Sequence, residues 1–328
     1  MSDLLFTVNA VMPIISMVLI GYLAKRLGII KREIAGGMNK LVFRLLLPIM
    51  LFLNVYRIEG FSDIGISYIL YVLAVELVLF AIGVAAAIAV TKDPKKRGVI
   101  NQVAFRSNYA LVGIPLATSL FGDAGGMVAT VLSVALIPMI NVLAVISLTS
   151  YTDGEGAKFN VKRVLIGIIK NPLIQSIALG GVALLIRLLF VKLNISFRLS
   201  DISWLYDGVL NKLSSVATPL ALIALGADFE FSRIGEMKKE ILTGVMLRCV
   251  LSPLIGLGIA LALGAFEGAH FAAFVAAFAP PLAVSSVPMT ESMGSDHKLA
   301  GQLVVWTTLT SALTLFLTVY ILRVIGIF

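Results

Sequence analysis

The chain has 328 residues, of which 59% are hydrophobic and 13% are charged, and its formal net charge is +8. Because a soluble domain needs about a quarter of its residues charged to cover its surface, this composition excludes a soluble protein and predicts a surface that faces lipid. One cysteine and two histidines exclude a disulfide framework and a Cys/His metal cluster, so we expect no metal and no cofactor.

Ten apolar segments are long enough to cross a bilayer, which takes about 20 mostly apolar residues. The loops between them are short, so we expect one all-α integral membrane domain. The first segment lacks a basic stretch before it, which favours a membrane span over a cleaved signal peptide. In chain order the predicted spans are 4–24, 38–57, 65–90, 99–121, 126–150, 164–190, 208–228, 239–265, 269–291 and 299–326.

The basic residues of the loops predict the orientation of these spans. Of the 26 lysines and arginines, 17 fall in or beside alternate loops on one side of the membrane and six fall on the other side. Because lysine and arginine concentrate in cytoplasmic loops, both termini are predicted to be extracytoplasmic. The positive net charge is then mostly a topology signal and not a nucleic-acid surface. We expect a multi-pass protein of the cell inner (plasma) membrane.

Proline and charged residues within the spans recur at a spacing of 171 to 173 residues. The pairs with this spacing are Pro48 and Pro219, Glu76 and Arg248, and Pro115 and Pro288. Five spans per half is an odd number, so the halves would cross the membrane in opposite senses, as inverted repeats do. We predict a first five-helix repeat at 1–150, a short cytoplasmic linker at 151–163 and a second, inverted repeat at 164–328. The alternative is that proline is simply common in membrane helices.

Spans four and nine contain the segments RSNYALVGIP (106–115) and APPLAVSSVP (279–288), which should interrupt them. Proline removes a backbone donor and clashes with the preceding turn. In a membrane the freed groups must be buried in protein or face water. Each break would expose a half-helix N-terminus with a partial positive charge, and two such ends facing one cavity would bind an anion. The predicted break and crossover residues are Pro48, Gly113, Pro115, Pro219, Pro281 and Pro288.

Neutral polar side chains near these breaks are the candidates for lining the cavity: Ser107, Asn108, Tyr109, Asn141, Ser215, Thr218, Ser285 and Ser286. Each hydroxyl could instead cap a carbonyl that proline frees. Arg106 could contact a carboxylate bidentately or snorkel to the cytoplasmic surface, and Arg248 has the same alternatives. Glu76 is an acid within a span, which makes it a functional candidate by default, although it could pair with an arginine.

At these residues the sequence resembles the auxin efflux carrier family. The matching blocks are LVFRLLLPIMLF, FRSNYALVGIPLATSLFG, TPLALIALGADFE and PPLAVSSVPMTESMG, followed by VVWTTLTSALTL. The resemblance implies two inverted five-helix repeats whose helices four and nine break and cross, as in bile-acid symporters and sodium/proton antiporters. It also implies an elevator-like movement against a scaffold and a homodimer. It assigns the asparagine of broken helix four to Asn108 and the crossover proline to Pro115, whereas Ser285 replaces an asparagine common in bacterial relatives.

The family moves small carboxylates: plant members export auxin, and some bacterial members are described as malate or malonate permeases. No GxxxxGK[ST] motif occurs, so ATP drive by a P-loop is not encoded. A membrane potential that is negative inside expels an anion by about 2.3 kcal/mol per charge per 100 mV, so we favour potential-driven export. The alternatives are a sodium- or proton-coupled symporter and a passive channel.

An enzyme is not expected. Asp207 and Asp228 lie in motifs that loosely resemble those of intramembrane aspartyl proteases, but they fall at opposite ends of one predicted span. At about 1.5 Å of rise per residue, some 30 Å would separate them, so they could not share a proton.

Overall fold

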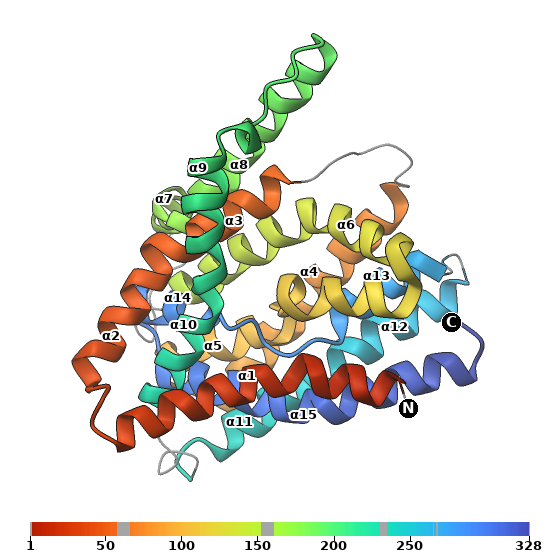
Figure 1. Cartoon of the computed structure of the whole chain (residues 1–328). Coiled ribbons are helices and arrows are strands. Elements are labelled where there is room, and N and C mark those ends of the chain that lie inside the picture. The colour runs from red at the N-terminus through yellow and green to blue at the C-terminus, as the bar shows by residue number, and fades with distance from the viewer. Residues whose placement is uncertain are drawn as a thin grey trace.

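The computed structural model describes residues 2–57, 66–151, 161–229, 235–264, 266 and 268–327, which are mostly helical (Figure 1). The α-helices in chain order are α1 (Ser2–Arg26), α2 (Arg32–Leu41), α3 (Leu47–Tyr56), α4 (Ile66–Val90), α5 (Pro94–Phe105), α6 (Ile114–Ser150), α7 (Val161–Lys170), α8 (Pro172–Lys192), α9 (Ser203–Leu205), α10 (Lys212–Asp228), α11 (Lys238–Val245), α12 (Ser252–Leu263), α13 (Gly268–Phe278), α14 (Ser286–Ser292) and α15 (His297–Val324). The shorter turns are the π-turns η1 (Val42–Leu46), η2 (Tyr109–Gly113), η4 (Tyr206–Asn211) and η6 (Met246–Leu251) and the 3-10 turn η3 (Leu199–Asp201). Within the described ranges no strand occurs apart from one isolated bridge.

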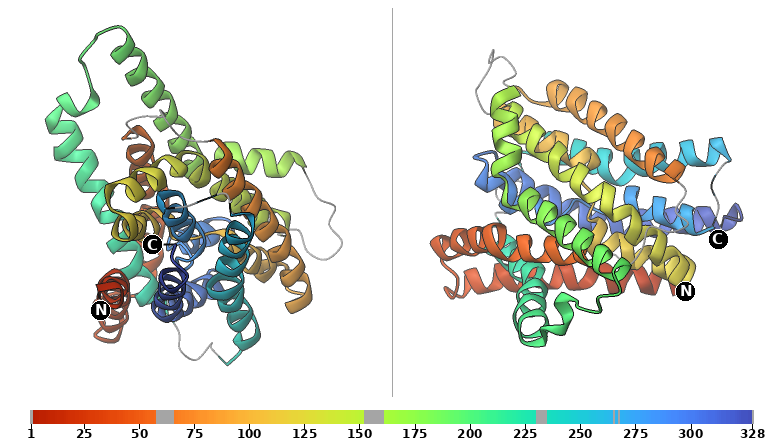
Figure 2. Two further views of the ribbon diagram at one scale, coloured as in Figure 1. Left: turned by 90° about the vertical axis from the view of Figure 1, so that its right-hand side faces the viewer. Right: turned by 90° about the horizontal axis from the view of Figure 1, so that it is seen from above.

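Seven of the described helical stretches are long and apolar enough to cross a membrane, and α13 is a shorter apolar helix. The seven are Glu33–Tyr56, Ile66–Val90, Ile114–Ser150, Pro172–Lys192, Ser203–Ala227, Lys238–Leu263 and His297–Val324. The predicted all-α membrane class is confirmed at this level. In Figures 1 and 2 the two chain ends lie at the same end of the molecule, because α1 and α15 run side by side in opposite directions.

Three helical stretches contain a π-turn directly before a proline. Pro48, Pro115 and Pro253 each occupy the second position of the α-helix that follows η1, η2 and η6. Proline cannot donate to the preceding turn, and a single wide π-turn is one way in which a helix adapts. The chain therefore passes Pro48 without a break, and α10 continues through Pro219. The prediction that Pro48 and Pro219 break their spans is wrong.

Two predicted span boundaries also need correction. The segment 164–190 is not one helix, because the side chain of Asn171 accepts hydrogen bonds from the amides of Leu173 and Ile174 and so begins α8 separately from α7. Predicted spans four and five are joined in α6, which kinks at Gly122. Gly122 has a φ of 60°, a region that favours glycine. Most of the predicted linker 151–163, namely 152–160, lies outside the described residues.

The helices pack in two groups. In one group α1 lies against α10, and α3 lies against α8. Glycines allow these close approaches, because a Cβ at Gly226 would clash with the carbonyl of Val18, and a Cβ at Gly180 would lie 2.8 Å from the carbonyl oxygen of Phe52. The second group contains α4, α5, α6 and α11 to α15, of which α15 also packs against α1 of the first group. Residues of both groups line the cavity described below.

Candidate binding site at a backbone crossover

Two interruptions of helix face each other in the second group. The first lies at 106–108, between the end of α5 and the start of η2, and the second lies at 279–285, between α13 and α14. Spans four and nine therefore break where their polar segments predicted a break. The breaking residues differ from the prediction in part. Pro281 lies within its break, whereas Pro115 and Pro288 lie in the helices that follow.

The two interrupted segments pair with each other through their backbones. Ser107 and Leu282 form an antiparallel bridge. The amide of Asn108 donates to the Pro281 carbonyl oxygen at 2.8 Å, and the Ala283 amide donates to the Arg106 carbonyl oxygen at 3.1 Å. These bonds satisfy polar backbone groups that would otherwise be unpaired within the membrane. Chain segments more than 170 positions apart thus hold each other at one crossing.

Four helix ends meet at this crossing. The helices that begin at Tyr109 and Ser286 present N-termini, and α5 and α13 present C-termini. Arg248 of η6 binds the C-terminal ends, because its guanidinium donates hydrogen bonds to the carbonyl oxygens of Ala104, Ala277 and Phe278. A cation at a helix C-terminus is favourable, since the last carbonyls lack intrahelical partners. Arg248 is fully buried, so the alternative that it snorkels to the surface is wrong.

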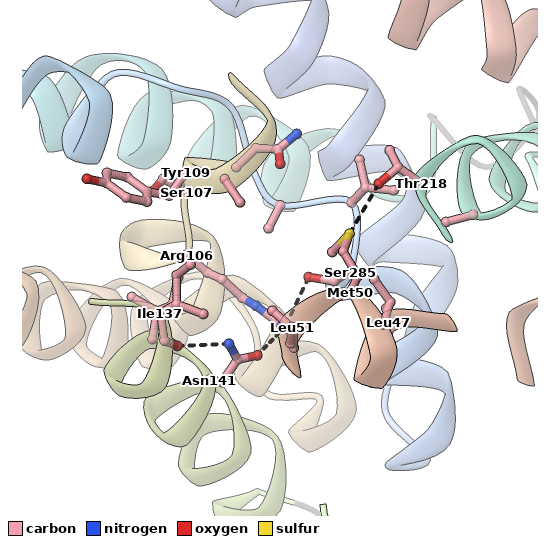
Figure 3. A pocket seen from close by; sticks show the side chains of 16 residues that line it. Leu47, Met50, Leu51, Arg106, Ser107, Tyr109, Ile137, Asn141, Thr218 and Ser285 are labelled. Atoms are coloured by element: carbon pink, nitrogen blue, oxygen red, sulfur yellow. Dashed lines mark hydrogen bonds between the residues drawn. The ribbon is translucent and has the colours of Figure 1, made fainter. Parts of the chain in front are cut away.

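Arg106 is 1% exposed, so the snorkelling alternative is wrong for it as well. Its Nη1 donates to Oε1 of Gln102 at 3.0 Å. Its Nη2 donates to Oδ1 of Asn141 at 3.1 Å and to Oγ of Ser285 at 3.2 Å (Figure 3). The Asn141 amide nitrogen donates to the Ile137 carbonyl oxygen at 2.8 Å, which turns the Asn141 oxygen toward Arg106. A guanidinium is thus held at the crossing by three neutral side chains from three parts of the chain.

A small cavity of about 60 Å³ lies beside Arg106 at the crossing. Its lining residues are Leu47, Met50, Leu51, Arg106, Ser107, Asn108, Tyr109, Ala110, Ile137, Ile140, Asn141, Thr218, Ala221, Ala283, Val284 and Ser285. They include one cation and no carboxylate. A wider vestibule of about 450 Å³ adjoins it and shares Met50, Ala110 and Thr218. The Thr218 hydroxyl lies 3.9 Å from the Met50 sulfur, so these two side chains stand where cavity and vestibule meet.

Six of the eight predicted pocket residues line the cavity: Ser107, Asn108, Tyr109, Asn141, Thr218 and Ser285. The other two do not. Ser215 lines the vestibule and donates to the Lys212 carbonyl oxygen, and Ser286 is buried beside the crossing. The Tyr109 hydroxyl donates to the Ala129 carbonyl oxygen at 2.6 Å, so only its ring borders the cavity.

Two buried polar atoms at the cavity have no hydrogen-bond partner among the described residues, namely Nδ2 of Asn108 and Oγ of Ser107. A buried polar group without a partner is destabilising by roughly 1–3 kcal/mol. Each such group calls for an explanation, such as water or a ligand that is bound part of the time. Both atoms belong to the break at 106–108, where a ligand beside Arg106 would find them. The crossing therefore offers hydrogen-bonding capacity that the described part of the chain leaves unused.

Gly113 lies in η2 and not in a break. A Cβ at this position would lie 2.5 Å from the Ala276 carbonyl oxygen of α13. Gly113 therefore permits η2 and α13 to touch, which agrees with the expected close backbone approach.

Glu76 lies away from the cavity lining, on α4. It is fully buried, and neither of its carboxylate oxygens accepts a hydrogen bond from the described residues. Arg248 is its charged neighbour, but no direct ion pair joins the two side chains among the described residues. The pairing alternative for Glu76 therefore stays a prediction.

Gln102 is a site residue that the sequence prediction missed. It accepts from Arg106, and its Nε2 donates to the Thr290 hydroxyl at 2.8 Å, which links α5 to α14. Gln102 precedes Arg106 by four residues, the spacing at which helical side chains meet, so this signal was available in the sequence. Met50 and its neighbours on α3 carry no such signal, because apolar residues are ordinary in a membrane helix.

Comparisons with known proteins identify the family of this chain. A family described as membrane transport protein matches residues 6–321. An uncharacterized transporter of Methanothermobacter thermautotrophicus is 25% identical over 94% of this chain and 95% of that protein. The uncharacterized transporter MJ1031 of Methanocaldococcus jannaschii is 27% identical over 66% of this chain and 67% of its own length. The uncharacterized transporter YfdV of Escherichia coli is 22% identical over 87% of each chain. Such a family implies a multi-pass membrane transporter and not an enzyme. The chain belongs to the membrane transport protein family, the auxin efflux carrier family that its sequence resembles.

Proposed function

We propose that this protein is a secondary transporter of small organic anions, and that it binds a carboxylate at the crossing beside Arg106. The observation that carries the proposal is a buried guanidinium at a cavity whose lining contains no acid. A carboxylate accepts hydrogen bonds, and Arg106, Ser107 and Asn108 supply donors there. The N-terminal ends of the helices starting at Tyr109 and Ser286 add partial positive charge.

The architecture that we propose has ten crossings in two inverted five-helix repeats, 1–150 and 164–328. The paired breaks support it, and so does the packing. If α1 corresponds to α8 and α3 corresponds to α10, then the contact of α1 with α10 is the counterpart of the contact of α8 with α3. The shared position of the two termini requires an even number of crossings, which ten satisfies.

The transport cycle that we propose is an elevator-like movement. The group of α4, α5, α6 and α11 to α15 would carry the crossing against the group of α1, α3, α8 and α10 as a scaffold. We propose that the protein is a homodimer in the inner membrane and that both termini are extracytoplasmic. In that orientation the vestibule residues Asn54, Ser214 and Ser215 lie in the extracytoplasmic half, so the vestibule opens outward.

Potential-driven export is the proposed energy source, because an inside-negative potential expels an anion without a coupling ion. The second candidate is a coupled symporter, and the observation that favours it is Glu76. This buried acid accepts no hydrogen bond from the described residues and lies close enough to Arg248 to interact with it. Protonation of Glu76 would change its interaction with Arg248, and Arg248 holds the ends of both broken helices.

The proposal is tested by currents across a supported membrane that carries the purified protein. The panel is indole-3-acetate, malate, malonate and a bile acid, each with and without sodium and at two pH values. A saturable, sodium-independent current for one anion, which is lost in Arg106→Gln, supports the anion uniporter. A current that requires sodium or a proton gradient assigns the symporter instead. Currents that persist unchanged in Arg106→Gln would contradict binding at the crossing.

A further inference from the structure

We propose that Arg106 gives the substrate-free carrier a net positive charge at its binding site, so that the membrane potential acts on the return of the empty carrier. The passage of the bound anion would then be nearly electroneutral. This inference rests on the proposed function, because it assumes that the crossing binds an anion and alternates between the two sides of the membrane.

The charges buried in the described part of the chain show why Arg106 stands apart. The buried charged residues are Glu76, Arg106, Glu240 and Arg248. Glu240 forms an ion pair with Lys96, with 2.8 Å between Nζ and Oε1. Glu76 and Arg248 are not among the residues that line the cavity. Arg106 differs from Glu240, because it forms no ion pair with the described residues and no carboxylate lines the cavity beside it.

The hydrogen bonds of Arg106 lead to the same result. Gln102, Asn141 and Ser285 accept from its guanidinium, and all three are neutral. They solvate the cation without neutralising it. Arg248 differs, because it faces carbonyl oxygens at helix C-termini, where the partial charge is negative.

The helix ends at the crossing do not offset Arg106 either. The N-terminus at Tyr109 has a partial positive charge, which is of the same sign as Arg106. The negative helix ends at the crossing are those of α5 and α13, and their carbonyl oxygens at Ala104 and Phe278 accept hydrogen bonds from Arg248. A bound monocarboxylate would therefore supply the negative charge that the site lacks.

The membrane potential would therefore act on only one of the two movements of the transport cycle, the return of the empty site. The loaded site, with the Arg106 guanidinium and a carboxylate together, has no net charge and crosses the field without electrical work. The empty site carries one positive charge, and moving one charge through 100 mV changes an equilibrium about fiftyfold. An inside-negative potential would draw the empty site toward the cytoplasm, where it loads, and each completed cycle would still export one negative charge.

The first test needs no substrate. Voltage steps are applied to giant liposomes that contain the full chain and no carboxylate, and the transient charge movement is recorded. We expect a saturating charge movement in the wild type, its loss in Arg106→Gln and its retention in Arg106→Lys, which keeps the charge. Lys162→Gln is the control, because it removes a positive charge from an exposed position on α7 and should leave the movement unchanged. A wild type without charge movement, or equal movements in the wild type and Arg106→Gln, would overturn the inference.

The second test compares exchange with net efflux for the anion that the supported-membrane panel identifies. Potentials are imposed with potassium and valinomycin. In the wild type, exchange of anion for anion should change less than about twofold over 100 mV, whereas net efflux should change several-fold. Exchange in the wild type that responds as strongly as net efflux would contradict the inference.

Failure of the proposed function has a different signature. It shows as no exchange of any carboxylate by a wild type that elutes as a folded protein, and the substrate-free charge movement still decides whether the crossing carries a mobile charge. If Arg106→Gln does not fold, judged by size-exclusion and thermal unfolding, then Arg106→Met takes its place as the uncharged variant. Loss of the charge movement in Arg106→Met supports the inference, and a movement equal to that of the wild type contradicts it.

Discussion

Arg106 and Arg248 are two buried arginines with different partners. Arg248 donates to main-chain carbonyls at helix ends, so its role is to hold the broken helices. Arg106 donates to side chains that border a cavity. A side-chain acceptor can turn away when a ligand arrives, whereas a main-chain carbonyl at a helix end cannot. The two arginines should therefore respond differently to mutation, one in stability and the other in binding.

Asn108→Ala should weaken substrate binding and leave folding intact. The Nδ2 of Asn108 has no partner among the described residues, so the protein loses no hydrogen bond there. A hydrogen bond to a charged acceptor contributes about 1.5–3 kcal/mol, so affinity should fall roughly 10- to 100-fold. Binding and thermal unfolding in detergent measure the two effects. Asn101→Ala is the matched control, because Asn101 donates to Ser147 and should lose stability but not affinity. Unchanged affinity in Asn108→Ala would remove Asn108 from the site.

Arg248→Gln should destabilise the protein by roughly 3–5 kcal/mol, the usual penalty for leaving a buried charge uncompensated. The change leaves Glu76 without its positively charged neighbour. The glutamine side chain is also shorter than arginine and extends less far toward the carbonyls of Ala104 and Phe278. Adding Glu76→Gln should recover part of the loss, because the stranded charge is then removed. Unfolding of both single variants and of the double variant forms the cycle that measures this coupling. Additive losses would show that the two side chains do not interact.

At the scale of helices and turns, the prolines correctly predicted that the helices are distorted, but they did not predict which form the distortion takes. Proline blocks one hydrogen bond, and a π-turn is enough to absorb that loss at Pro48 and Pro253. The helix opens fully at 106–108 and 279–285, where each segment finds hydrogen-bond partners in the other. Such partners come from the opposite half of the chain. For this reason no local pattern could place the breaks to the residue.

Pro115→Ala should impair transport more than stability. Alanine restores an amide that can bond to the carbonyl of residue 111, so the π-turn η2 would tend to close into an ordinary turn. That change would shift Asn108 relative to Leu282 without opening the core. We expect a loss of transport of about tenfold or more, by analogy with the loss from a small misplacement of binding groups, and a small change in Tm. Pro172→Ala at the start of α8 is the control, and equal losses of transport and stability in Pro115→Ala would make the proline structural.

For the molecule as a whole, hydropathy predicted an all-helical membrane protein, and the structure and family confirm that class. Six of eight predicted pocket residues also line the cavity. The division at Asn171 was missed, because a helix cap interrupts an apolar stretch without changing its hydropathy. The roles of Arg106 and Arg248 depend on which side chains and carbonyls surround them. Those neighbours lie up to 179 positions away in the chain.

Orientation in the membrane can be tested with the vestibule. Ser215→Cys in a Cys249→Ala background places a thiol at an exposed vestibule residue. With extracytoplasmic termini, this thiol should react with a membrane-impermeant reagent added to intact spheroplasts. Lys162→Cys, exposed on α7, should react only after permeabilisation. The reverse pattern would invert the proposed topology.

The backbone pairing at the crossing has a consequence for how the family could diversify. The bonds between Asn108 and Pro281 and between Ala283 and Arg106 are made by main-chain atoms. Side chains at these positions can therefore change without loosening the junction, apart from the need to keep the amides of Asn108 and Ala283. A new cargo preference could arise by substitution at a few positions while the junction stays constant.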